Sequence, residues 1–167
     1  NANAGSITIN DVFDSATGTV ALNATGGVNI NANFTAGGTT NFDTDTDDNG
    51  TSDLVVADGV TVSSTNNAFN ITANDINLNT SGALTSGDGD MTIRVSDSAV
   101  IGIGAAAGGM AISGSELQRI TAENLTFADD GAGAGNINII VDGITAAQSE
   151  NIDVLVTLNA TGPTGTI

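Results

Sequence analysis

The chain of 167 residues carries 19 acidic and 2 basic side chains, which gives a formal net charge of −17 at pH 7. Such a negative field, with only two arginines, argues against nucleic-acid binding, because that binding needs basic side chains to neutralise phosphates. The chain has no His and no Cys, which excludes a thiol nucleophile, an imidazole base, a disulfide and the usual kind of zinc site.

Short runs of alternating apolar and polar residues follow one another along the chain, the pattern of half-buried β-strands. In chain order the clearest runs are 7–9, 19–22, 28–30, 54–56, 60–62, 69–71, 76–78, 91–95, 100–103, 125–127, 137–141 and 154–158. Clusters of Gly and Asp, such as 87–90, separate them as turns. Only 114–124 suits a helical turn, and its residues 120–122 read as strand. The alternating runs therefore predict an all-β chain. No apolar run approaches the 18 residues of a spanning helix, so we predict no membrane insertion.

Internal repeats indicate a solenoid. The triplet Ile-Thr-Ala begins at Ile71, Ile120 and Ile144, which are 49 and 24 residues apart, and the sequence Val-x-Leu-Asn-Ala-Thr-Gly at 20–26 returns at 156–162. A period in the low twenties, with about three short strands per repeat, fits a parallel β-helix of about seven turns. An immunoglobulin-like sandwich also suits this length, but it explains neither the repeats nor the missing core Trp. We predict a single β-solenoid over residues 1–167, as a segment of a longer or polymeric structure.

Two stretches of the C-terminal half resemble the repeats of large filamentous-haemagglutinin-like adhesins. AVIGIG at 99–104, followed by MAISGSELQRITAENLT at 110–126, is similar to their "IGLG" and "ISxAELxRITAxxLTI". GNINI at 135–139 and VDGITAA at 141–147 are similar to their "GNITVDGITAA". The resemblance extends from about residue 54 onward. It implies a right-handed parallel β-helix segment of a very long secreted or cell-surface protein of Gram-negative type, with structural motifs that carry no catalytic or binding residues.

The acidic segment 43–53, DTDTDDNGTSD, is the strongest candidate metal site. Calcium takes six to eight hard oxygens, and alternating acidic residues around a Gly turn can supply them from one loop. If Asp45 is the first ligand of such a loop, its twelfth position is Val56, so the bidentate Glu that usually stands there is missing. The alternative is a solvated acidic loop whose side chains bond their own backbone. We expect a loop insertion at 43–53 and a calcium site whose ligands are Asp43, Asp45, Asp47, Asn49 and Asp53.

Several other polar residues receive structural interpretations. Asn70 and Asn77 are expected to join Asn ladders, in which stacked amides bond between turns of the solenoid. Arg94 and Arg119 are expected to pair with nearby acids, and Glu116 is three residues from Arg119.

These observations favour a structural protein over an enzyme. We predict no catalytic residue and no enzymatic activity, because no Tyr, Trp or His can line a sugar site and only two arginines can neutralise a uronate. We expect a secreted or cell-surface structural and adhesive segment, which forms a stalk or filament by self-association end to end or by continuing in a longer chain. The alternative is a glycan- or ice-binding module, whose flat face would hold aligned Thr side chains in one column.

Overall fold

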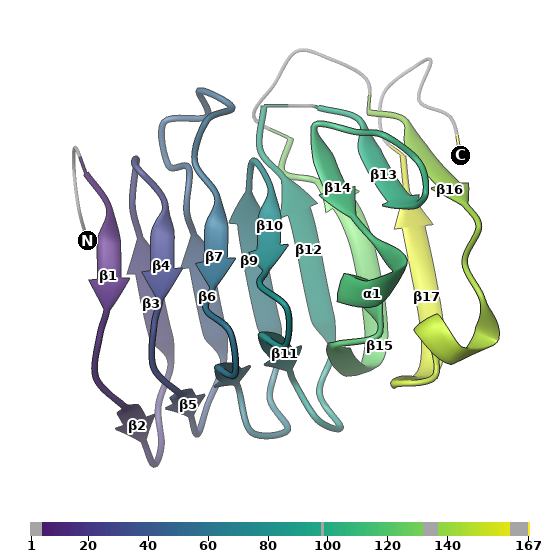
Figure 1. Cartoon of the computed structure of the whole chain (residues 1–167). Coiled ribbons are helices and arrows are strands. Elements are labelled where there is room, and N and C mark those ends of the chain that lie inside the picture. Colours follow the sequence, from purple (N-terminus) through teal and green to yellow (C-terminus); the bar gives the residue numbers. More distant parts are fainter. Residues whose placement is uncertain (1–4, 98, 132–136, 161–166) are drawn as a thin grey trace.

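The computed structural model describes residues 5–97, 99–131, 137–160 and 167. Within them the chain winds as a parallel β-helix with three short strands per turn, and its parallel strands stack in register (Figure 1). The all-β fold class and the solenoid architecture predicted from the sequence are confirmed. Neither helix of the described part has the length and apolar character that crossing a membrane would require.

The strands form three faces, named here in the order in which the chain visits them. The first face holds β1 (Ile7–Ile9), β4 (Val28–Ile30), β7 (Leu54–Val56), β10 (Ile76–Leu78), β14 (Met110–Ile112), β13 (Ile101–Gly104) and β16 (Ile139–Asp142). The second face holds β2 (Phe13–Ser15), β5 (Phe34–Ala36), β8 (Thr61–Ser63), β11 (Ala83–Thr85) and the start of β15 (Ile120–Asp129). The third face holds β3 (Val20–Asn23), β6 (Thr40–Asp43), β9 (Phe69–Ala73), β12 (Met91–Val95), the rest of β15 and β17 (Ile152–Asn159).

The core consists of columns of apolar side chains that point into the solenoid. Successive residues of a strand point to opposite faces, so every second residue enters the core and the residues between them face outward. One column of the third face shows this, because Phe42, Ile71, Ile93 and Phe127 are all buried. The register places them in one line with the partly buried Leu22 and Leu158: Leu22, Phe42, Ile71, Ile93, Phe127, Leu158.

Phenylalanine fills the N-terminal part of the core. The rings of Phe13 and Phe34 stack with their centroids 4.5 Å apart, and Phe42 meets Phe34 edge to face at 5.3 Å. Phe42 also meets Phe69 edge to face, with centroids 5.2 Å apart. Both arrangements are preferred by aromatic quadrupoles. The first three turns are therefore joined by one continuous aromatic cluster.

The fifth turn departs from this regular winding. Strands β13 and β14 are parallel neighbours, although only residues 105–109 connect them. Adjacent parallel strands normally need a crossover of a dozen or more residues. The short return is possible because glycine allows a close approach: a Cβ on Gly108 would lie 2.4 Å from the backbone nitrogen of Gly102. The first face thereby gains one strand more than the third face.

Side chains replace the strand ladder where β14 lies beside β10. The N–H of Leu78 donates to Glu116 Oε1 at 3.1 Å, and the N–H of Ala111 donates to Asp75 Oδ1 at 2.9 Å. Arg119 donates to the carbonyl oxygens of Leu78 at 2.6 Å and of Gly82 at 3.0 Å. Glu116 is held in place by the capping box of α1 (Gly114–Leu117). We call this set of contacts the seam; it supplies hydrogen bonds that a neighbouring strand would otherwise provide.

The seam changes the interpretation of Arg119. Arg119 and Glu116 do not pair with each other; both bond the backbone around β10. For Arg94 the described part of the structure gives no ion pair. The Asn ladder is confirmed at Asn70, whose amide donates to Asn41 at 3.0 Å. Asn77 makes no such bond within the described residues.

The repeats predicted the period correctly but not every position. Ile7, Val28, Leu54 and Ile76 occupy one column, at separations of 21, 26 and 22 residues. The triplets at Ile71 and Ile120 lie on different faces, and the triplet at Ile144 leads into η1 (Ala146–Gln148). Their spacing therefore does not measure one turn. Within the described residues the third face has six strands, whereas about seven turns were expected.

Replacing Arg119 by Met should destabilise the solenoid, because two buried carbonyl groups lose a charged donor. We expect a decrease of about 2 kcal/mol in the free energy of unfolding, measured by urea denaturation followed by circular dichroism. The matched control is Arg94→Met, which removes the same charge from the outward side of β12 and should change stability by less than about 0.5 kcal/mol. Equal losses in the two variants would contradict the role of the seam.

Because the pKa of Asp75 is raised, its contribution to the free energy of unfolding should increase on mild acidification. Burial is the main reason that its pKa is raised above 3.8; the charges of Asp53 and Glu116 add to this, and the N–H groups of Ala111 and Ile76 oppose it. Since the folded state holds the proton more tightly, this contribution to stability is complete below pH 3.8 and is lost as the pH rises through the raised pKa. Asp75→Asn should therefore be more stable than wild type at pH 7, and the advantage should shrink at pH 5. Asp11→Asn, at an exposed position, is the control for the charge change.

Candidate functional site

The acidic segment lies in the connection from β6 to β7, where the chain passes from the third face to the first. Its base is folded against the solenoid, since Thr44, Asp45 and Ser52 are buried. The Thr44 hydroxyl donates to the carbonyl oxygen of Ser52 at 3.0 Å, and the Ser52 hydroxyl donates to that of Thr25 at 2.8 Å. Local hydrogen bonds of Thr and Ser thus fix where the segment leaves and rejoins the fold.

Asp45 is the central residue of this segment. Its side chain is fully buried, and its Oδ2 accepts hydrogen bonds from the Gly50 N–H at 3.0 Å and from the Ser96 hydroxyl at 2.7 Å. Ser96 follows β12, two turns further along the solenoid. The Oδ1 atom of Asp45 is also buried, and it has no hydrogen-bond partner in the described structure. One oxygen of this carboxylate therefore joins two turns, and the other is unsatisfied.

Asp43 lies beside Asp45 in an environment that opposes its ionisation. Burial is the main reason that the pKa of Asp43 is raised, and the charges of Asp130 and Asp45 raise it further. The N–H of Asp45, which lies 3.4 Å from Asp43 Oδ1, acts in the opposite direction. Negative charge is therefore concentrated at this corner.

The other three predicted ligands lie apart from this pair. Asp47 and Asn49 are exposed, and the Asn49 amide donates to Asp47 Oδ2 at 3.0 Å. Asp53 accepts a hydrogen bond from the Asn74 amide at 3.0 Å. Within the described residues no group of three or more acids is placed to hold a metal ion. The structure thus separates the five predicted ligands into two pairs and one single residue, and calcium binding stays a prediction.

Sequence reasoning missed the part of Ser96, which is 51 residues from Asp45. The signal lies in the register of the third face: Asp43 aligns with Arg94 through Thr72, and Asp45 and Ser96 each follow two residues later. Counting register across two turns would have brought the two positions together.

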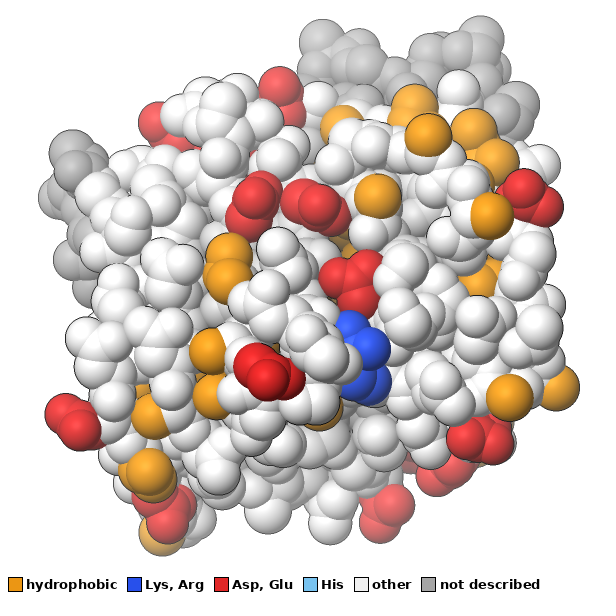
Figure 2. All heavy atoms as spheres, in the orientation of Figure 1, with side chains coloured by type: hydrophobic (Ala, Val, Ile, Leu, Met, Phe, Trp, Pro, Cys, Tyr) orange, Lys and Arg blue, Asp and Glu red, His pale blue; other side chains and the backbone are white. Residues whose placement is uncertain are grey.

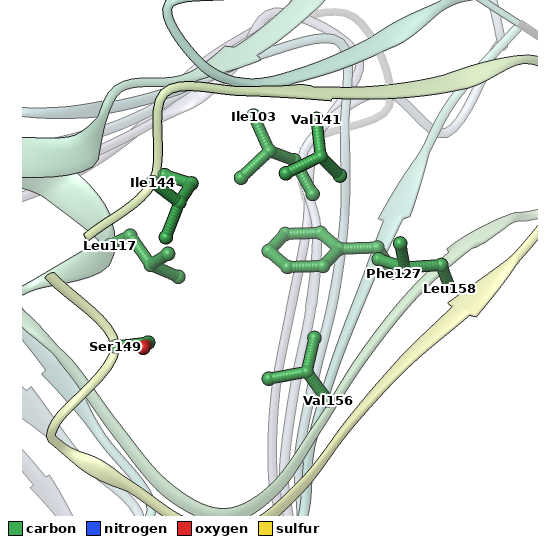
Figure 3. A pocket seen from close by; sticks show the side chains of 8 residues that line it. All are labelled: Ile103, Leu117, Phe127, Val141, Ile144, Ser149, Val156 and Leu158. Carbon is green, nitrogen blue, oxygen red and sulfur yellow. The ribbon is translucent and has the colours of Figure 1, made fainter. Parts of the chain in front are cut away.

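The C-terminal end of the solenoid holds a second candidate site, an apolar cavity of about 210 Å³. Phe127 and Leu158 line one side and Leu117 and Ile144 the opposite side (Figure 3). The full lining is Ile103, Leu117, Phe127, Val141, Ile144, Ser149, Val156 and Leu158. The sixth turn consists of β16, η1 and β17. In it, η1 takes the place of the second-face strand that each earlier turn has in the described residues. The interior of the last turn is consequently underfilled.

The strands next to this cavity expose large apolar side chains. In β16 these are Ile140 at 47% and Val141 at 46%, and in β17 they are Val154 at 68%, Leu155 at 54% and Val156 at 42%. On the face drawn in Figure 2, hydrophobic side chains lie over the C-terminal strands and, as a second group, over the N-terminal turns, whereas acidic side chains are scattered. An exposed apolar cluster of this kind marks a surface suited to contact with further protein.

Comparisons of the chain with models of protein families, with curated proteins and with solved structures found no match.

Proposed function

We propose that this chain is an extracellular structural and adhesive segment, a β-solenoid that is extended at its ends into a stalk or filament. The observation that carries the proposal is the placement of the longest sequence repeat. The register of the third face leads from Val20 through every turn to Val156, and likewise from Asn23 to Asn159. The two copies of Val-x-Leu-Asn thus form the first and last strands of one face. The two final residues of the second copy, Thr161 and Gly162, lie outside the described residues.

Two equivalent strands at opposite ends favour extension by the same stacking that builds the solenoid. A strand like β3 placed after β17 would continue the column from Leu158 to another Leu22. Parallel, in-register stacking of identical side chains satisfies backbone groups and packs like residues together, as in other stacked-strand assemblies. The end strands otherwise present unpaired N–H and C=O groups.

The distribution of polarity supports the same proposal. Acidic side chains are scattered over the face drawn in Figure 2, where their repulsion opposes lateral association. Apolar side chains concentrate at the C-terminal end, and at the other end Ile7, Phe13 and Leu22 are only partly buried. Contact is therefore favoured end to end. Either a second copy of this chain or further solenoid turns of a longer chain would provide it.

The resemblance of segments 99–126 and 135–147 to filamentous-haemagglutinin-like adhesins favours a secreted or cell-surface location; residues 135 and 136 lie outside the described part. We propose no enzymatic activity, because the candidate sites are a structural loop and an apolar end.

The proposal predicts concentration-dependent assembly that depends on the end of the rod. Wild-type protein should associate as its concentration rises, in sedimentation velocity, and should form rods of increasing length in negative-stain electron microscopy. Val156→Asp should remain monomeric, because it places a charge between stacked turns. Val55→Asp makes the same change on the outward side of β7 in the middle of the rod and should assemble like wild type. Assembly that Val156→Asp leaves unchanged, or a wild type that stays monomeric at millimolar concentration, would refute end-to-end association of this chain.

Binding of a glycan is a second candidate function, which one structural feature supports. On the third face Thr92, Thr126 and Thr157 are aligned on three successive strands. On the second face Thr35, Ser63, Thr85 and Thr121 are aligned in the same way. Successive hydroxyl groups are then roughly 4.8 Å apart, the spacing of stacked strands. Such columns favour a repeating polyhydroxylated partner. In the neighbouring column of the third face, Asp43 and Arg94 interrupt any regular ice-like lattice.

If the third-face column binds a glycan, removing its central hydroxyl should weaken that binding. We expect Thr126→Val to lower affinity about tenfold, the loss of about one to two hydrogen bonds. Glycan-array binding followed by calorimetry on a positive glycan provides the measurement. Thr8→Val on the first face is the matched control. Equal affinities for both variants and wild type would remove this candidate.

A further inference from the structure

One oxygen of the buried Asp45 carboxyl group has no hydrogen-bond partner among the described residues. The Asp45 side chain is fully buried, and Oδ2 has two donors, whereas Oδ1 has none among the described residues. A buried polar atom without a partner is rare in folded proteins, and an isolated buried charge is strongly unfavourable. The Oδ1 atom therefore points to a missing partner.

No basic side chain supplies that partner. The chain has two arginines and no lysine or histidine. Arg119 is engaged in the seam with the carbonyl groups of Leu78 and Gly82. Arg94 lies on β12 and pairs with no acid of the described chain. Neither arginine therefore supplies a partner for Asp45 Oδ1.

Two further acidic residues, Asp43 and Asp97, lie near the Asp45 site and would favour a cation there. Asp43 precedes Asp45 by two residues, and Asp97 approaches Gly50, whose N–H donates to Asp45. A Cβ on Gly50 would lie 2.9 Å from Asp97 Oδ2, so the absence of a side chain there allows this approach. Asp45 and Asp97, which belong to two connections of the solenoid, thus both approach Gly50.

We propose that Asp45 Oδ1 anchors a calcium ion at the corner where the second and fourth turns meet. The remaining ligands would be backbone carbonyl groups and water, since the described residues provide no group of three acids for a metal. Calcium accepts such mixed oxygen sets and irregular geometry, whereas magnesium demands a near-ideal octahedron. With one anchoring carboxylate the affinity belongs in the range of extracellular modules, a dissociation constant of roughly 10⁻⁴–10⁻³ M.

This site differs from the one expected from the sequence. The loop pattern assigned Asp47, Asn49 and Asp53 as ligands, but Asp47 and Asn49 bond each other at the surface and Asp53 bonds Asn74. The proposed ion instead stabilises the junction between Asp45 and Ser96. Calcium would then hold together two turns that are separated by 51 residues of sequence.

The test compares two variants with the same change in net charge. Wild-type protein in 10 mM calcium should melt roughly 3–10 °C higher than in chelator, and sodium chloride of equal ionic strength should not reproduce the shift. Asp47→Asn should retain the shift. Asp45→Asn should lose it, and in chelator it should melt no lower than wild type, because the uncompensated charge is gone. Equal calcium shifts in all three proteins, or a shift lost only in Asp47→Asn, would overturn the proposal.

A measurement on wild-type protein keeps the test independent of how the variants fold. In a calcium titration followed by ¹⁵N–¹H correlation spectra, the amide signals of Gly50 and Ser96 should move together and saturate as one site. Changes confined to Asp47 and Asn49, or spread evenly over the acidic residues, would contradict it. Both measurements use dilute monomer, so their outcome is separate from that of the assembly experiment.

Discussion

The whole structure depends on the in-register stacking of parallel turns. Most backbone groups of a strand find their partners in the turns before and after it, because its own turn continues on another face of the solenoid. The same register aligns Phe42, Ile71, Ile93 and Phe127 into a buried column. Hydrogen bonding and apolar burial are thereby satisfied together, and neither is complete for a turn alone. At an end of such a stack, backbone N–H and C=O groups lack strand partners and apolar side chains are exposed.

Interruptions of the stack show how strong this requirement is. Where β14 lies beside β10, Asp75, Glu116 and Arg119 supply hydrogen bonds to backbone groups. The short return between β13 and β14 adds a strand to the first face, and in the next turn η1 replaces a strand of the second face. These two irregularities precede the cavity and the exposed apolar strands at the C-terminal end. The end that we propose for extension is therefore also the least regular part of the fold.

Charge and apolar surface are divided between different parts of the molecule. The acidic side chains visible in Figure 2 are scattered over the surface, where solvent screens their mutual repulsion. Asp45 is the exception: it is buried in a connection, and it bonds Ser96 two turns away. A cation at this position would give Asp45 Oδ1 a partner. Further turns at the ends would give the end strands partners for their backbone N–H and C=O groups.

The sequence by itself determined most of the strands, the approximate period and the equivalence of Val20 and Val156, because side-chain alternation and repetition are local properties of the chain. It failed for β2, β5, β6, β11 and β14, strands of three or four residues with too little alternation to be distinguished from loops. It also treated Asp45 and Asp47 as similar ligands, since their local spacing is equivalent. Only the tertiary structure decided that Asp45 is buried against Ser96 while Asp47 faces solvent. The physical reason is that register between turns depends on the lengths of all the intervening loops, which no short sequence motif encodes.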